Sequence, residues 1–167
     1  MLEKRMKKAF SRLFAAAMGL ILAGQFAASA NAGLQEAHEA MVREDFAAAI
    51  REATPLAQAG NPDAAYMLGL LHLHGRGFKQ SPREAVTWLR RAAGHNHAAA
   101  QLYLGRLAMV GQGTTLDFVE AYKWFALAAR NGNTAAKRMA ASIDRQLTPA
   151  QRAQAKARVA AWKGTGK

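Results

Sequence analysis

Hydrophobic positions in the middle of the chain follow a helical period in two consecutive blocks. In the first block, Ala64, Leu68 and His72 recur at i, i+4 and i+8, which places them on one face of a helix. The pair Asn61-Pro62 supplies an N-cap followed by a residue suited to the first helical position. Gly75 provides the left-handed conformation at which such a helix ends. The pattern predicts a helix from residue 61 to residue 74, named helix A.

The second block predicts a helix of the same kind, named helix B. It opens at Ser81-Pro82-Arg83-Glu84, which has the residue types of a capping box with Pro in the first turn. Its apolar face then runs through Ala85, Trp88, Leu89 and Ala92. Alanine on this face allows close approach to helix A, and the Trp ring fills the remaining space. The two blocks therefore predict one antiparallel helical hairpin.

The hairpin occurs twice, at a fixed offset of 36 residues. Seven identities between the copies are glycine, alanine or tryptophan: Gly69, Gly75, Gly77, Ala85, Trp88, Ala92 and Ala93 reappear as Gly105, Gly111, Gly113, Ala121, Trp124, Ala128 and Ala129. A period of this length is typical of stacked arrays, in which each unit buries one face against the next. Gly69 and Gly105 lie inside helix A, where glycine costs about 1 kcal/mol relative to alanine. We interpret both as sites of close helix packing.

Degenerate copies flank the two hairpins. Residues 35–59 have the pattern of a helix pair with a short loop at 42–44, and residues 133–146 repeat the pattern of helix A. Thr148 and Gln151 have the spacing of a further capping box, which opens a last helix ending near Trp162. The sequence therefore predicts an all-α solenoid of helix-turn-helix repeats with degenerate capping helices.

The repeated residues resemble the Sel-1-like repeat, a relative of the tetratricopeptide repeat. The resemblance rests on Ala64-x-x-x-Leu68-Gly69, Gly75-x-Gly77, Glu84-Ala85-x-x-Trp88 and Ala92-Ala93, and on their second copies Ala100-x-x-x-Leu104-Gly105, Gly111-x-Gly113, Glu120-Ala121-x-x-Trp124 and Ala128-Ala129. It implies a right-handed α-solenoid used as an adaptor or regulator in protein complexes. The sequence departs from the family where an aromatic residue is usual, because His72 and Ala108 stand there.

The first 32 residues have the pattern of a signal peptide. A basic stretch precedes an uncharged, mostly apolar run at 13–28, and Ala30-Asn31-Ala32 forms a small-x-small cleavage signal. We expect cleavage near Ala32 and a periplasmic or secreted chain that begins at Gly33. An uncleaved membrane anchor is the alternative. Three parts follow the signal peptide: a degenerate helix pair at 33–63, the two repeats at 64–136, and basic capping helices at 137–167.

The positive charge is concentrated at the C-terminal end. The chain carries a formal net charge of +12, and residues 137–167 hold eight basic residues against the single acid Asp144. This basic patch is formed by Lys137, Arg138, Arg145, Arg152, Lys156 and Arg158. It suits weak contact with an anionic envelope polymer or lipid, or serves only as a solvated helix face. No base-reading motif accompanies the charge, so we do not expect nucleic acid as a partner.

A second apolar stripe on successive A helices suggests where a protein or peptide partner binds. The stripe contains Met67, Leu71 and His74, then their counterparts Tyr103, Leu107 and Val110, and then Met139 and Ile143. Solenoids of this type present helix A on the concave side, so the stripe predicts an apolar groove. Methionine and aromatic residues suit adaptable binding. The alternative is that these residues pack between adjacent units.

The sequence offers no clear catalytic or metal-binding constellation. The five histidines include His72 and His74, which a regular helix directs about 200° apart, and His95 and His97, which lack a third ligand. No nucleophile elbow or phosphate loop is present. We therefore expect a monomeric binding scaffold without enzymatic activity, cofactor or metal. A hydrolase of envelope material is a further alternative that no residue supports.

Overall fold

The regular structure of the chain is α-helical throughout its described part. The computed structural model describes residues 31–164, in which a helical segment at 31–42 precedes seven labelled helices. These are α2 (Phe46–Gln58), α3 (Pro62–His74), α4 (Pro82–Gly94), α5 (Ala98–Val110), α6 (Phe118–Arg130), α7 (Thr134–Asp144) and α8 (Pro149–Ala160). The predicted all-α architecture is confirmed. Among these helices, none combines the length and the apolar character that crossing a membrane requires.

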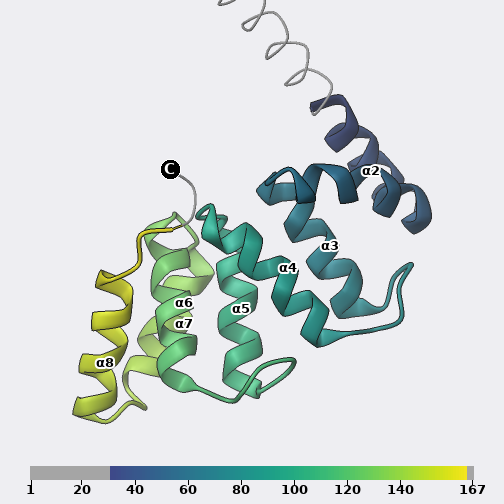
Figure 1. Cartoon of the computed structure of the whole chain (residues 1–167). Helices are drawn as coiled ribbons and strands as arrows, with labels where there is room; N and C mark the ends of the chain where they lie inside the picture. The colour runs from purple at the N-terminus through teal and green to yellow at the C-terminus, as the bar shows by residue number, and fades with distance from the viewer. Residues whose placement is uncertain (1–30, 165–167) are drawn as a thin grey trace, which may run out of the picture.

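The helices pack as consecutive hairpins. Helix α3 packs on α4 and α5 packs on α6, as predicted for the A and B helices of each repeat. Contacts of α2 with α3, of α4 with α5 and of α6 with α7 join one hairpin to the next. Figure 1 shows this progression, with α8 lying beside α6 and α7 at one end. Because each unit contacts chiefly its neighbours, the whole is a stacked array.

The N-terminal helix pair has the predicted short connection, shifted by one residue. Val42 still belongs to the helical segment 31–42, and the turn occupies residues 43–45 with Glu44 at φ 59°. The predicted signal peptide lies outside the described residues except for its last two positions. Asn31 and Ala32 are the first residues of the helical segment.

Local side chains set the helix starts, with one correction. Asn61 caps α3, and Thr148 with Gln151 forms the predicted capping box of α8. The capping box predicted at Ser81 is only half formed. The Ser81 side chain accepts a hydrogen bond from the amide of Glu84, but its own amide donates to the carbonyl of His72 at 2.9 Å. The amide is therefore used to tie helix B to the end of helix A.

The two glycines inside the A helices lie where helix B comes closest. A Cβ atom at Gly69 would stand 2.8 Å from Cγ of Leu89, and one at Gly105 would stand 2.5 Å from the ring of Phe125. Both partners are fully buried. Each helix crossing therefore has no room for a methyl group, as predicted from the repeated glycines.

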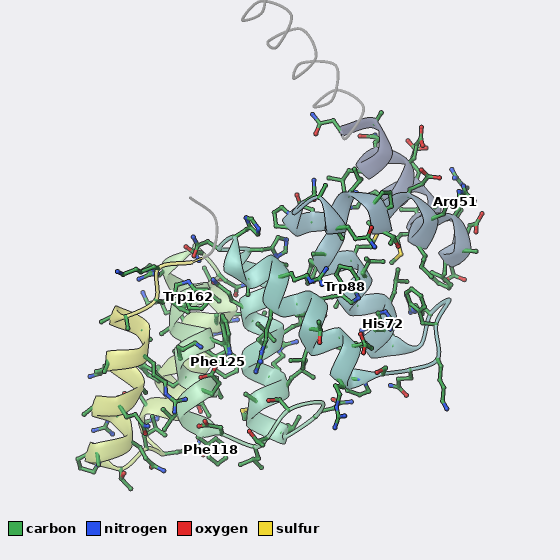
Figure 2. The ribbon with its side chains drawn as sticks, in the orientation of Figure 1. Arg51, His72, Trp88, Phe118, Phe125 and Trp162 are labelled. Atoms are coloured by element: carbon green, nitrogen blue, oxygen red, sulfur yellow. The ribbon has the colours of Figure 1, made fainter. Side chains whose placement is uncertain are left out.

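The two repeated tryptophans differ in burial, although the sequence predicts both to be buried. Trp124 is buried, and the ring of Trp162 packs edge-on against it at 5.1 Å between centroids. Trp88 is only half-buried, and the guanidinium of Arg91 lies over its ring, 4.5 Å from the ring centroid. The C-terminal tail thus completes the core of one repeat only. Figure 2 labels both Trp88 and Trp162.

His72 stacks on Phe78 from the loop that follows α3. The two rings lie 4.0 Å apart between centroids and are almost parallel, at 4°. Nδ1 of His72 is buried without a hydrogen-bond partner among the described residues. Burial lowers the pKa of His72 below its ordinary value of 6.5, and the nearby Glu84 opposes this only in part.

We expect Gly105→Ala to destabilise the fold. The methyl group raises helix propensity by about 1 kcal/mol, but displacement of the Phe125 ring costs about 3 kcal/mol, which leaves a net loss of about 2 kcal/mol. Urea unfolding measures this. Phe125→Leu supplies the control background, because Leu89 stands at the equivalent position, and the cost of Gly105→Ala should fall there. An equal cost in both backgrounds would show that the ring is not the obstacle.

We expect the His72→Phe variant to lose less stability in acid than the natural chain. The pKa of His72 is lower in the folded state than in the unfolded state, so the unfolded chain binds the extra proton first. The stability contributed by neutral His72 is therefore fully present above about pH 6.5, the unfolded-state pKa, and is lost as the pH falls from there through the lower pKa of the folded state. Melting temperatures on either side of that pH measure the effect. A variant that loses as much stability as the natural chain would contradict the role of His72.

Candidate functional site

A hollow opens where the helical segment 31–42, α3 and the start of α5 meet. Its volume is about 380 Å³. Aromatic, thioether and aliphatic side chains form most of its lining, with polar groups at the rim: His38, Met41, Asp63, Tyr66, Met67, Leu70, His97 and Ala99. We name this hollow the A-helix groove. Its lining combines an apolar surface with a few polar groups, as ligand-binding clefts do.

An aromatic cluster lies on the α5 side of the groove, and two of its members, Tyr66 and His97, line the hollow. The ring of Tyr66 lies 4.6 Å from the ring of His97 and 5.9 Å, edge-on, from the ring of Tyr103. The guanidinium of Arg106 stands 5.6 Å from the Tyr103 ring. The cluster joins two successive repeats, because Tyr66 belongs to α3 and Tyr103 to α5.

His97 is held rigidly at the start of α5. Its Nδ1 accepts a hydrogen bond from the amide of Ala100, so it serves as the N-cap of the helix. Its Nε2 lies 3.1 Å from a carboxylate oxygen of Asp63. Because Nδ1 acts as acceptor, the ring proton belongs on Nε2, which donates to Asp63. This hydrogen bond fixes the His97 ring against Tyr66.

Tyr66 stays neutral over the whole physiological range. Burial, and next to it the neighbouring Tyr103, raises the pKa of Tyr66 to about 12. A neutral phenol keeps both an apolar ring face and a hydroxyl group that donates and accepts hydrogen bonds. This combination is common at protein interfaces.

A second, smaller hollow continues the groove towards the end of α3. It measures about 190 Å³ and is lined by Met41, Leu70, Leu71, His74 and Arg76. Met41 and Leu70 line both hollows. The accessible surface therefore extends along most of the length of α3, which is enough for an extended segment of a partner.

The structure divides the predicted stripe into core and surface residues. Met67, Leu71, Leu107 and Ile143 are buried in the core, each at most 5% exposed, so they pack between helices. Tyr103 and Met139 are half-buried, while His74 and Val110 are exposed. Met67 and Leu71 also line the hollows described above, whereas Leu107 and Ile143 fit the alternative that residues of the stripe pack between adjacent units.

The accessible stripe on α3 contains Tyr66 and Leu70, each one residue before a predicted stripe residue, together with His74, which was predicted. Sequence reasoning missed Tyr66 and Leu70 because apolar residues surround α3 almost completely, so periodicity does not mark an outer face. Three further lining residues of the groove, Met41, Asp63 and His97, were missed as well. The i, i+4 spacing of Tyr66 and Leu70 was the available signal.

Two members of the predicted basic patch serve the fold. Arg158 lies 3.3 Å from Asp117 and 3.0 Å from Glu120, which docks α8 on the start of α6. Arg152 donates to the carbonyl of Asp144 at 2.6 Å and to that of Leu147 at 3.3 Å, so it caps the end of α7. The freely exposed members are Lys137, Arg138, Arg145 and Lys156.

The histidines of residues 31–164 have separate structural roles. His72 stacks on Phe78 and His97 caps α5, as described above. His38 and His74 line different hollows. Within that part of the chain, no three His, Asp or Glu side chains converge in a way that could hold a metal ion.

The stacked hairpins and the side-chain groove along their A helices define a helical-repeat scaffold. A family model supports a narrower assignment. The model described as Sel1 repeat matches residues 62–97 and again residues 98–133. These residues form two Sel1 repeats of 36 residues each, which confirms the predicted resemblance.

Two solved structures show the same architecture. The protective antigen c5321 of uropathogenic Escherichia coli, which displays an SLR fold, is 28% identical with a TM-score of 0.74, and the match covers 78% of this chain and 29% of that chain. A Sel1 repeat protein from Oxalobacter formigenes is 29% identical with a TM-score of 0.62, and the match covers 68% and 88% of the two chains. The chain thus spans less than a third of the length of c5321. No curated protein matches it.

Proposed function

We propose that this chain is an exported interaction scaffold that binds a protein or peptide segment along the A-helix groove. The observation that carries the proposal is the Tyr66–Tyr103 pair, which joins two repeats at the edge of a hollow of about 380 Å³. Rigid aromatic rings that border an accessible apolar hollow are frequent binding hot spots. The scaffold regulates or assembles an envelope complex and catalyses no reaction itself.

The shape and chemistry of the groove favour a segment with apolar anchor side chains. Met41, Met67 and Leu70 supply an adaptable floor, and the neutral phenol of Tyr66 supplies a hydrogen-bonding wall. Asp63 and His38 stand at the polar rim. A peptide that inserts one or two apolar side chains between these groups would bury them from water, which is the main source of affinity.

The alternative function, binding of anionic polymer or lipid through the basic C-terminal helices, has weaker support. Arg152 and Arg158 already have carboxylate partners within the fold. Four exposed basic residues remain on α7, α8 and the connection between them. Scattered surface charges of this kind usually give only non-specific attraction.

We expect Tyr66→Ala and Tyr103→Ala to weaken partner binding by about 30-fold, because loss of an aromatic hot spot typically costs 2 kcal/mol or more. The assay is capture from a cell-envelope extract with the full chain as bait, followed by mass spectrometry and measurement of Kd for the retained protein. Tyr122→Ala is the matched control, because Tyr122 is half-buried on α6, outside the groove.

Circular dichroism verifies that each variant folds. Retention of the same protein by the natural chain, Tyr66→Ala and Tyr103→Ala would contradict the groove as the binding surface. If added salt releases the retained material from the natural chain and from both variants, the basic C-terminal helices are the binding surface instead.

Export is the second part of the proposal and has a direct test. The basic stretch, the apolar run at 13–28 and the small residues at 30–32 predict a mature chain that begins at Gly33. Mass spectrometry of the chain isolated after cell fractionation should therefore give Gly33 as the first residue in the periplasmic or secreted fraction. Ala30→Lys blocks the cleavage signal and should retain the precursor. A chain that keeps its N-terminus at the membrane would support the anchor alternative.

A further inference from the structure

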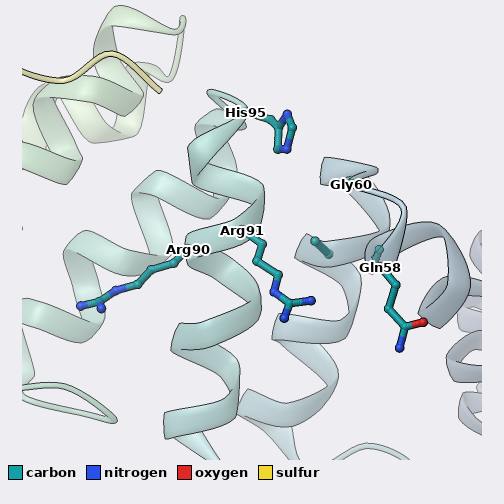
Figure 3. A pocket seen from close by; sticks show the side chains of 7 residues that line it. Gln58, Gly60, Arg90, Arg91 and His95 are labelled. Carbon is teal, nitrogen blue, oxygen red and sulfur yellow. The ribbon is translucent and has the colours of Figure 1, made fainter. Parts of the chain in front are cut away.

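A third cavity lies at the edge of the stack, between the ends of α2 and α4 and the start of α3. It measures about 530 Å³ and is lined by Ala57, Gln58, Gly60, Ala65, Arg90, Arg91 and His95. Figure 3 shows this pocket from close by. No lining residue is acidic, and none is shared with the A-helix groove. We name it the arginine pocket.

The equivalent place one repeat later is filled by side chains. Gln101 stands where the arginine pocket has Ala65, and it is fully buried. Its Nε2 donates to the carbonyl of Ala93 at 3.2 Å, and Nδ2 of Asn131 donates to its Oε1 at 2.9 Å. Leu127, at the position of Arg91, is fully buried as well. The second junction is therefore closed by an amide pair and an aliphatic side chain.

Three substitutions between the repeats open the pocket and make it cationic. Ala65 removes the side chain that fills the second junction, Arg91 replaces the buried leucine, and His95 replaces the asparagine that holds the glutamine. Side-chain volume is lost at the floor while positive charge is gained at the wall. The same backbone thus makes a filled core at one junction and an open pocket at the other.

The cationic wall has a defined geometry. The guanidinium of Arg91 stacks on the Trp88 ring, 4.5 Å from its centroid. In Figure 3, Arg91 extends from α4 towards the side of Gln58, His95 lies beside Gly60, and Arg90 points away from Gln58. Among residues 31–164, no carboxylate lies within ion-pair distance of Arg91. Its guanidinium donors are therefore available to an anionic ligand.

We propose that the arginine pocket binds a carboxylate side chain of an acidic peptide segment. The planar fork of Arg91 matches a carboxylate in two parallel hydrogen bonds, and the amide of Gln58 adds a neutral donor. The apolar floor of Ala57 and Ala65 suits the aliphatic stem of a glutamate. A compact phosphate gains nothing from this floor, and the C-terminal dipoles of α2 and α4, which disfavour any anion, oppose its higher charge more than that of a carboxylate.

The proposal is independent of the A-helix groove, and charge-matched variants test it. The probe is a fluorescein-labelled hexaglutamate peptide, titrated against the full chain at low salt and followed by fluorescence anisotropy. Arg91→Leu should weaken binding by about ten-fold, as expected for loss of a charged hydrogen-bonding group. Arg83→Leu removes the same charge from the same helix at an exposed residue that does not line the pocket, so its effect should stay within about two-fold.

A second variant closes the pocket without removing Arg91. Ala65→Gln combined with His95→Asn rebuilds the amide pair of the second junction, so it should fill the floor, keep the melting temperature and abolish binding of the peptide. Equal losses for Arg83→Leu and Arg91→Leu, or unchanged binding by the filled variant, would overturn the proposal. Displacement of the peptide by inorganic phosphate, but not by chloride at equal ionic strength, would assign the pocket to phosphate instead.

Discussion

The closeness of helix A to helix B in each hairpin is the constraint on which the rest of the structure depends. A methyl group does not fit between Gly69 and Leu89 or between Gly105 and Phe125 without movement of the partner side chain. Glycine inside a helix lowers the stability of that helix by about 1 kcal/mol relative to alanine. The packing of helix A against helix B must therefore stabilise the hairpin by more than this amount. In the first hairpin, a hydrogen bond from the backbone amide of Ser81 to the carbonyl of His72 then fixes the start of helix B at the end of helix A. Each hairpin is thereby a rigid unit with one geometry.

Rigid hairpins bring together side chains that are distant in sequence. Asp63 and His97 are 34 positions apart and lie 3.1 Å from each other, because the N-terminal ends of α3 and α5 are neighbours in the stack. The Tyr66–Tyr103 contact arises in the same way. Asp63, Tyr66 and Tyr103 stand on helices and His97 is the N-cap of α5, so both pairs have the low conformational freedom that favours binding.

The sequence predicted those features of the fold that local chemistry determines. Asn61 and Gly75 bound α3 where the sequence placed its ends, since capping involves residues within one turn of the helix terminus. The groove was harder to predict. Because α3 is apolar on all sides, only its packing partners decide that Met67 is buried and Tyr66 half-exposed. The ion pairs of Arg158 span 38 and 41 positions and depend on the docking of α8, which no local pattern encodes.

Departures from the repeat explain why the two ends of the stack differ in character. In the C-terminal half, substitutions add core: Gln101 and Leu127 fill a junction, and Trp162 covers Trp124. In the N-terminal half, the equivalent positions hold Ala65 and Arg91, which leave a cavity open. The A-helix groove lies in the same half, against the helical segment 31–42. In a stacked array, stability is approximately a sum over units and their interfaces. A well-filled C-terminal half can therefore compensate for an N-terminal half whose surfaces are left open for partners.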